Sequence, residues 1–154
     1  MAELFEKTSI KSMNLPNRCF RSATWSGVAD ERGYITEQGL EFYSRLGSGQ
    51  IGAIITGYQY VMKNGIQLPF MTGNYDDSQI AGLAKLAERA KAQGSPIIGQ
   101  IVHCGVRANP KLFFDGGDVW GPSAIPDLAS GIVPREVGKT EILELLEAYA
   151  NAAF

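Results

Sequence analysis

The segment IGAIITGYQYV, residues 51–61, decides the fold class of this chain. Its centre is an unbroken aliphatic run, which is typical of a strand buried on both faces, as in a parallel sheet. The segment IIGQIV, residues 97–102, has the same character and follows Pro96. A shorter strand is predicted at 18–23, RCFRSA, after the turn signal of Asn14–Asn17. Three such strands predict a parallel sheet.

The segments that follow these strands show the periodicity of helices. Apolar residues recur at three- and four-residue spacing, and residues that cap helices precede them. The predicted helices run over 36–46 with Thr36 as N-cap, from Asp77 or Ser78 to a stop at Gly94, and onward from Thr140. Strands that alternate with helices indicate right-handed parallel crossovers. The order fits half of a (βα)₈ barrel or the start of a doubly wound sheet.

The last predicted helix has no stop signal before Phe154. We therefore expect residues 1–154 to form one incomplete domain. The spacing places the following residues on the inward face of this helix: Leu143, Leu146, Tyr149 and Ala150.

The composition excludes several classes of function. Residues are 45% hydrophobic and 19% charged, which is the balance of a globular chain. Fourteen basic against sixteen acidic residues provide no cationic field for nucleic acid or an anionic membrane surface. No run approaches the roughly 20 apolar residues of a membrane span, and the start MAELFEKTS is unlike a signal peptide. These features predict a cytoplasmic protein with a small-molecule or protein partner.

Cysteine and histidine usage favours neither a disulfide framework nor a metal centre. Cys19 and Cys104 lie in or beside apolar runs, which is typical of buried reduced thiols. One histidine and two scattered thiols fall short of a structural zinc set. The string GSGQIG at 47–52 has dinucleotide-loop spacing, but it follows a helix and precedes a strand, which reverses the required order. We interpret it as a helix C-cap followed by a strand start.

Small and polar residues replace the aliphatic pattern where each predicted strand ends. These places are Ser22 to Trp25, Thr56 to Tyr58, and Gln100 to Gly105. Ligands of parallel α/β folds bind at the carboxyl ends of the strands. We therefore expect the functional site there.

Four residues at these strand ends have two interpretations each. The Gln100 amide needs partners for its carbonyl and its NH₂, supplied either by a flat heterocycle or by backbone and water. His103 is either a packed, hydrogen-bonded residue or a functional one. Trp25 is either a stacking wall for a planar ligand or a core aromatic residue. Cys104 is either structural or a redox thiol, and no resolving cysteine lies close in sequence.

Five motifs occur in the order of a known family: LFEKTSIKSMNLPNRCFRSAT, IGAIITGYQYV, IIGQIVHCG, WGPSAIP and PREVGKTEILELLEAYANAA. The chain resembles, over nearly its whole length, the N-terminal half of the old yellow enzyme family, the FMN-dependent NADH:flavin oxidoreductases. The resemblance implies a longer (βα)₈ barrel with FMN across the carboxyl ends of its strands and NAD(P)H as reductant. It also implies an activated C=C or related acceptor as substrate, and a β-hairpin from residues 4–13 that closes the barrel bottom.

The resemblance also assigns site residues. The expected FMN contacts are Ser22, Ala23 and Thr24 through their backbone, Gly57 beneath the ring, and Gln100 at the pyrimidine portion. Trp25 and His103, the latter in a Q-x-x-H-x-G signature, are the expected substrate-side residues. Many members carry Thr or Cys at the place of Trp25, and the arginine of the usual H-x-G-R is offset by one residue, at Arg107. Redox tuning and substrate shape are therefore expected to differ here.

The remaining family motifs fall after the third helix. These are the His-x-x-His/Asn pair that anchors substrate, the tyrosine proton donor and the phosphate-binding loops, so no catalytic residue is expected within residues 1–154. A half barrel also exposes unpaired strand edges and its inner face. We expect the isolated chain to be inactive and to fold stably only with a complementary half-chain, a second copy or further polypeptide.

Two other functions fit the same residues. One is a non-catalytic half-barrel that acts as an assembly or interaction module. The other is a different barrel enzyme whose polar strand ends bind a sugar or phosphate ester.

Overall fold

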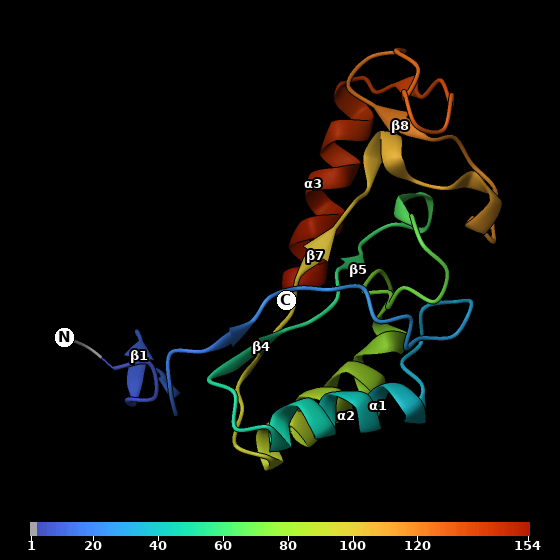
Figure 1. The fold of residues 1–154 in the computed structure, drawn as a ribbon. Helices are drawn as coiled ribbons and strands as arrows, with labels where there is room; N and C mark the ends of the chain where they lie inside the picture. The colour runs from blue at the N-terminus through green and yellow to red at the C-terminus, as the bar shows by residue number, and fades with distance from the viewer. Residues whose placement is uncertain (1–2) are drawn as a thin grey trace.

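The computed structural model describes residues 3–154 (Figure 1). Residues 1–2 of the predicted domain lie outside the described residues. An N-terminal hairpin pairs β1 (Thr8–Ile10) with β2 (Met13–Leu15), and Lys11 adopts a left-handed conformation in its turn. The hairpin expected over 4–13 is therefore present, a few residues further along the chain.

The core of the sheet is parallel, as predicted. It has the order β3 (Phe20–Arg21), β4 (Ala53–Ile55) and β6 (Ile97–Ile98). Two helices, α1 (Glu37–Ser48) and α2 (Ile80–Ala92), pack against each other and lie side by side in Figure 1. Their apolar faces bury one hydrophobic core, made of Val28, Leu40, Tyr43, Ile54 and Leu86.

The predicted boundaries of these helices are largely confirmed. The Thr36 hydroxyl accepts the Gly39 N–H at 3.2 Å and caps α1. Gly94 has φ +88° directly beyond the end of α2. The prediction that Asp77 or Ser78 caps α2 is wrong, because the Asp76 carboxylate accepts the Ser78 N–H of a 3₁₀ turn that leads into the helix.

Two predicted strands are each divided in the structure. The segment 51–61 contains β4 and β5 (Gln59–Tyr60), and 97–102 contains β6 and β7 (Ile101–Val102). Ile55 pairs with Ile98 and Gln59 with Ile101, so three residues separate the paired positions on one strand and two on the other. The extra residue forms a β-bulge, a feature that is common beside functional sites.

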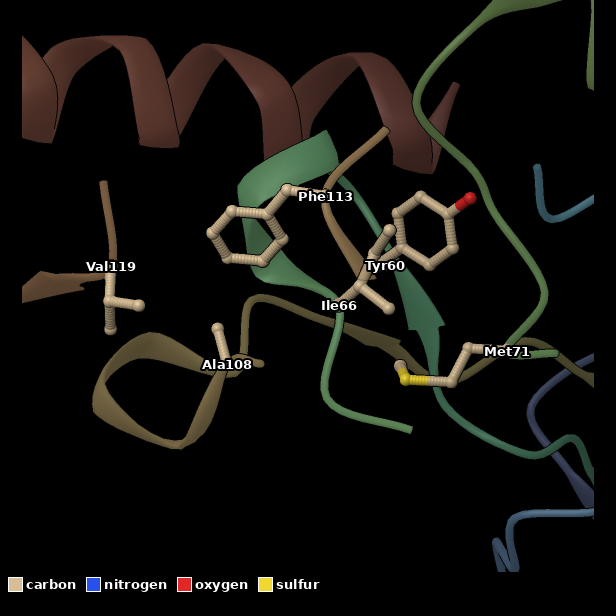
Figure 2. Close-up of a cluster of buried hydrophobic side chains, with 6 residues drawn as sticks. All are labelled: Tyr60, Ile66, Met71, Ala108, Phe113 and Val119. Atoms are coloured by element: carbon tan, nitrogen blue, oxygen red, sulfur yellow. The ribbon is translucent and has the colours of Figure 1, made fainter. Parts of the chain in front are cut away.

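A second hydrophobic core lies beyond the bulge (Figure 2). Its buried residues are Tyr60, Ile66, Met71, Ala108, Phe113 and Val119. Tyr60 belongs to β5, and the others come from the loops after β5 and β7. These loops include short 3₁₀ turns at Lys63–Gly65, Gly105–Arg107 and Pro110–Leu112. A parallel pair, β8 (Trp120–Gly121) with β9 (Arg135–Glu136), then leads to the last helix.

The last helix, α3 (Lys139–Ala153), lies beside β7 in Figure 1. The predicted cap, Thr140, lies inside the helix. Gly138 is the N-cap, and its N–H donates to the Glu141 carboxylate at 2.9 Å. Within residues 3–154, none of the helices is both long enough and apolar enough to cross a bilayer.

The predicted inward face of α3 is correct only at Tyr149. Leu143 and Leu146 are 56% and 61% exposed, and Ala150 is also exposed. The half-buried face is instead formed by Leu145, Ala148, Tyr149 and Ala152. Leucines occur on both sides of this helix, so periodicity alone does not select the side that packs against β7.

Candidate functional site

The three strand ends meet at one edge of the sheet. Arg21 is opposite Ile54, and Ile54 is opposite Ile97, so the residues that follow these strands lie at the same end. A Cβ on Gly57 would lie 2.9 Å from the Thr24 carbonyl oxygen, which places the second strand end directly against the first. The Gly57 N–H donates to the buried Tyr43 hydroxyl at 2.9 Å. Glycine is therefore required here by close backbone approach.

Gln100 stands at the third strand end with its backbone held and its side chain exposed. Its N–H donates to the Thr56 hydroxyl at 3.1 Å, and its carbonyl accepts the Gln59 N–H at 2.8 Å. The side chain is exposed, and no hydrogen bond within residues 3–154 engages its amide. A donor and an acceptor are thus presented on a fixed backbone.

The loop after β3 presents backbone to the same edge. Ser22 and Thr24 are exposed and Ala23 is half-buried. The Thr24 hydroxyl donates to the Ser22 carbonyl at 3.3 Å, which closes a local turn. All five predicted cofactor-binding residues, three in this loop together with Gly57 and Gln100, thus follow strand ends on the same side of the sheet.

Trp25 is held as a wall at the edge of this loop. Its indole N–H donates to the Pro69 carbonyl at 3.1 Å, while the side chain remains 41% exposed. Gly27, at φ +60°, leaves room for the indole, since a Cβ there would lie 3.2 Å from the ring. The only donor of the indole is therefore used inside the protein, and the ring presents an apolar surface.

His103 has both ring nitrogens occupied by protein groups. Nδ1 accepts the Gly105 N–H at 3.1 Å, so Nε2 carries the proton and donates to Asn64 Oδ1 at 3.2 Å. The ring stacks on Trp120, with 5.9 Å between centroids. Burial lowers the pKa of His103, which favours the neutral imidazole. These contacts support the packed interpretation, and the role of His103 towards substrate stays a prediction.

His103 is expected to make the protein less stable in mild acid. Its pKa is depressed in the folded state, so its contribution is fully present above 6.5, its usual value, and is lost as pH falls through the folded value. The free energy of unfolding should decrease by up to about 1.4 kcal/mol per pH unit between 6.5 and the lower folded pKa, and should not change further through this group below it. Urea titrations of the wild type and of His103→Gln measure this decrease, and equal slopes in the two proteins would contradict it.

Cys104 has the character of a structural residue. Burial raises its pKa to about 11, so the thiol stays protonated at neutral pH. Neither cysteine forms a disulfide, and both are half-buried. A redox role for Cys104 therefore has no support from its surroundings.

The sequence did not predict which residues hold the site in place, although it placed Thr56 at a strand end and Tyr149 on the inward face of the last helix. Thr56 and Gln59 fix the backbone of Gln100, Tyr43 fixes Gly57, and the Tyr149 hydroxyl accepts the His103 N–H at 2.7 Å. Each acts through a contact distant in sequence. The unexpected polar residues Thr56 and Gln59 inside an aliphatic strand were the one available signal.

The residues at this edge fit a flat flavin. Gly57 lets the second strand end lie directly against the Thr24 backbone, Gln100 offers an unpaired amide, and Trp25 provides an apolar wall. Ser22 to Thr24 would contribute exposed backbone groups. No cationic side chain belongs to this set, so a phosphate would need donors from elsewhere.

Comparisons with known proteins identify the family and the fold. The model of the NADH:flavin oxidoreductase / NADH oxidase family matches residues 3–154. NADH:acrylate oxidoreductase of Vibrio harveyi is 35% identical over 99% of this chain and 15% of its own length. NADPH dehydrogenase of Bacillus subtilis is 32% identical over 98% of this chain and 44% of its own length.

Solved structures show the same fold. A 2-naphthoyl-CoA reductase superposes with a TM-score of 0.91 at 25% identity, over 97% of this chain and 24% of that protein. The old yellow enzyme homologue of Zymomonas mobilis gives 0.87 at 23% identity, over 99% of this chain and 44% of that protein. The predicted resemblance and the partial barrel are thus confirmed, and the chain spans less than half the length of these relatives. The chain belongs to the NADH:flavin oxidoreductase / NADH oxidase family.

Proposed function

We propose that residues 1–154 are the N-terminal part of an FMN-dependent NAD(P)H oxidoreductase that reduces an activated C=C or a related acceptor. The observation that carries this proposal is the convergence of three strand ends, where Gly57 meets the backbone of Thr24 and Gln100 presents an unpaired amide. Family membership supports the same cofactor. When bound, FMN would supply hydride transfer between NAD(P)H and the acceptor.

The residues of this chain would bind and orient the cofactor. Gln100 would exchange hydrogen bonds with the pyrimidine edge of the flavin, and the backbone of Ser22 to Thr24 would border the ring. Trp25 would pack beside the flavin or the substrate without donating a hydrogen bond, because its N–H is held by Pro69. We assign no catalytic residue to this part of the protein.

The test is flavin binding by the complete protein, meaning this chain together with the polypeptide that completes its barrel. We expect purified protein to be yellow and to be stabilised against heat by added FMN. Colourless protein that FMN does not stabilise would overturn the proposal. That result would favour a non-catalytic assembly module instead.

We further propose that residues 1–154 form one incomplete barrel domain that needs a complement, in a cytoplasmic protein. The exposed apolar face of α3, with Ile142, Leu143 and Leu146, supports a covering partner, since such surface is unfavourable in water. The two free cysteines are consistent with a reducing compartment.

Residues 1–154 expressed alone are expected to self-associate, because the α3 face and the sheet edges would be uncovered. Adding the complementary half of the barrel should convert these assemblies into one defined complex. Analytical ultracentrifugation distinguishes the species. A compact, stable monomer of the isolated chain would contradict the need for a complement.

A further inference from the structure

A network of hydrogen-bonded polar groups begins at the backbone of Gln100. The β-bulge leaves the Gln100 N–H without a main-chain carbonyl opposite it, and the Thr56 hydroxyl accepts it at 3.1 Å. The same hydroxyl oxygen accepts the Gln59 side-chain Nε2–H at 3.2 Å. Thr56 and Gln59 are only 3% and 4% exposed, so water cannot replace these bonds.

The network continues to the C-terminal end of α3. Gln59 Oε1 accepts Asn74 Nδ2–H at 3.2 Å, and Asn74 Nδ2 also donates to the Ala152 carbonyl at 3.0 Å. Ala152 lies in the last turn of α3, where carbonyls have no partner within the helix. Asn74 thus links the C-terminal end of α3 to Gln59 in β5.

The Gln59 amide also lies against the residue before Gln100. A Cβ on Gly99 would be 3.7 Å from Gln59 Oε1, and the Gln59 N–H holds the Gln100 carbonyl at 2.8 Å. Both main-chain groups of Gln100 are therefore fixed by residues of one buried network. The backbone from which the exposed Gln100 side chain extends is therefore held in place.

We propose that Thr56, Gln59 and Asn74 are positioning residues that aim the Gln100 amide at the cofactor and couple the end of α3 to the cofactor site. This inference rests on the proposed function. The mechanism is preorganisation: the network fixes the backbone of Gln100 at the strand end, so this backbone loses no further conformational freedom when the flavin binds the side-chain amide. The network is uncharged, so its effect is on affinity and orientation.

The central test replaces Thr56 by valine, which keeps the side-chain shape and removes the hydroxyl. In the complete protein, FMN affinity should fall about tenfold, because the Gln100 N–H and the Gln59 amide both lose their acceptor. Thr56→Ser restores the hydroxyl and should remain within about twofold of the wild type. Bound flavin should also show an altered visible spectrum in Thr56→Val, since its hydrogen-bonding environment changes.

A matched control separates positioning from stability. Thr36→Val also removes a hydroxyl with two hydrogen bonds, to Gly39 N–H and the Val28 carbonyl, at the start of α1. It should lower the melting temperature without changing FMN affinity. If Thr56→Val fails to fold, Asn74→Ala tests the far end of the network, with a smaller loss of affinity expected.

A double-mutant cycle tests whether Thr56 acts through Gln100. Thr56→Val should cost no further FMN affinity in a Gln100→Leu background, because the amide that Thr56 positions is gone. Additive losses would overturn the inference, as would unchanged FMN affinity in both Thr56→Val and Asn74→Ala. Absence of FMN binding by the unaltered protein would instead overturn the proposed function.

Discussion

Replacing Gln100 by leucine is expected to lower the affinity of the complete protein for FMN by about 10- to 100-fold. The amide provides one donor and one acceptor, and each hydrogen bond that is lost contributes about 0.5–1.5 kcal/mol. Gln100 has no side-chain partner within residues 3–154, so leucine removes no bond internal to the protein. The loss should therefore appear in flavin binding and leave the stability of the cofactor-free protein within about 0.5 kcal/mol.

The measurement is titration of cofactor-free protein with FMN, followed by quenching of flavin fluorescence. Gln38→Leu is the matched control, because Gln38 is an exposed glutamine on α1 that is not among the predicted cofactor-binding residues. Wild-type affinity in Gln100→Leu would contradict the assignment of Gln100 to the cofactor. An equal loss in Gln38→Leu would show that the effect is not local.

Replacing Gly33 by alanine is expected to destabilise the fold by about 4 kcal/mol or more, enough to unfold many domains. Gly33 has φ +84°, and a Cβ there would lie 2.3 Å from the Tyr60 hydroxyl and 2.6 Å from the Gly73 backbone nitrogen. Neither group is free to move. Tyr60 donates to the Arg32 carbonyl at 2.8 Å, and the Gly73 N–H donates to the Gly33 carbonyl at 2.9 Å.

Gly33→Ala destabilises the fold in two ways, through the left-handed backbone conformation and through the clash of the new Cβ with its neighbours. Gly94→Ala separates these two contributions. Gly94 has nearly the same dihedral, φ +88°, and nothing lies within 4 Å of a Cβ placed on it. It should therefore show only the conformational cost, about 1 kcal/mol. Thermal or urea unfolding compares the variants. Similar stability of Gly33→Ala and Gly94→Ala would show that the packing of Gly33 against Tyr60 and Gly73 does not matter.

The strands and the first two helices were predictable because their information is local. The aliphatic centre of 51–61 indicated a buried parallel strand, and Thr36 and Gly94 marked helix ends. The N-cap of α3 was not predictable in the same way, because the nearby Thr140 offered a stronger capping signal than Gly138. The burial of α3 depends on what lies beside it, which its own sequence does not specify.

The site was predictable in part. The strand ends and the polar residues after them could be recognised, and the resemblance to a flavoenzyme family added roles for Gly57 and Gln100. The bulge could not be recognised, because register is a relation between two strands. The network of Thr56, Gln59 and Asn74 follows from that register, so it emerged only from coordinates.

The extra residue between Ile55 and Gln59 also makes this stretch intolerant of any change in length. Side chains alternate along a strand, so deleting one residue there would turn Gln59 and Tyr60 to the opposite faces. Tyr60 would leave the cluster of Figure 2, and Gln59 would no longer reach Thr56. Insertions and deletions in homologous genes should therefore be absent from this interval, even where its individual amino acids differ.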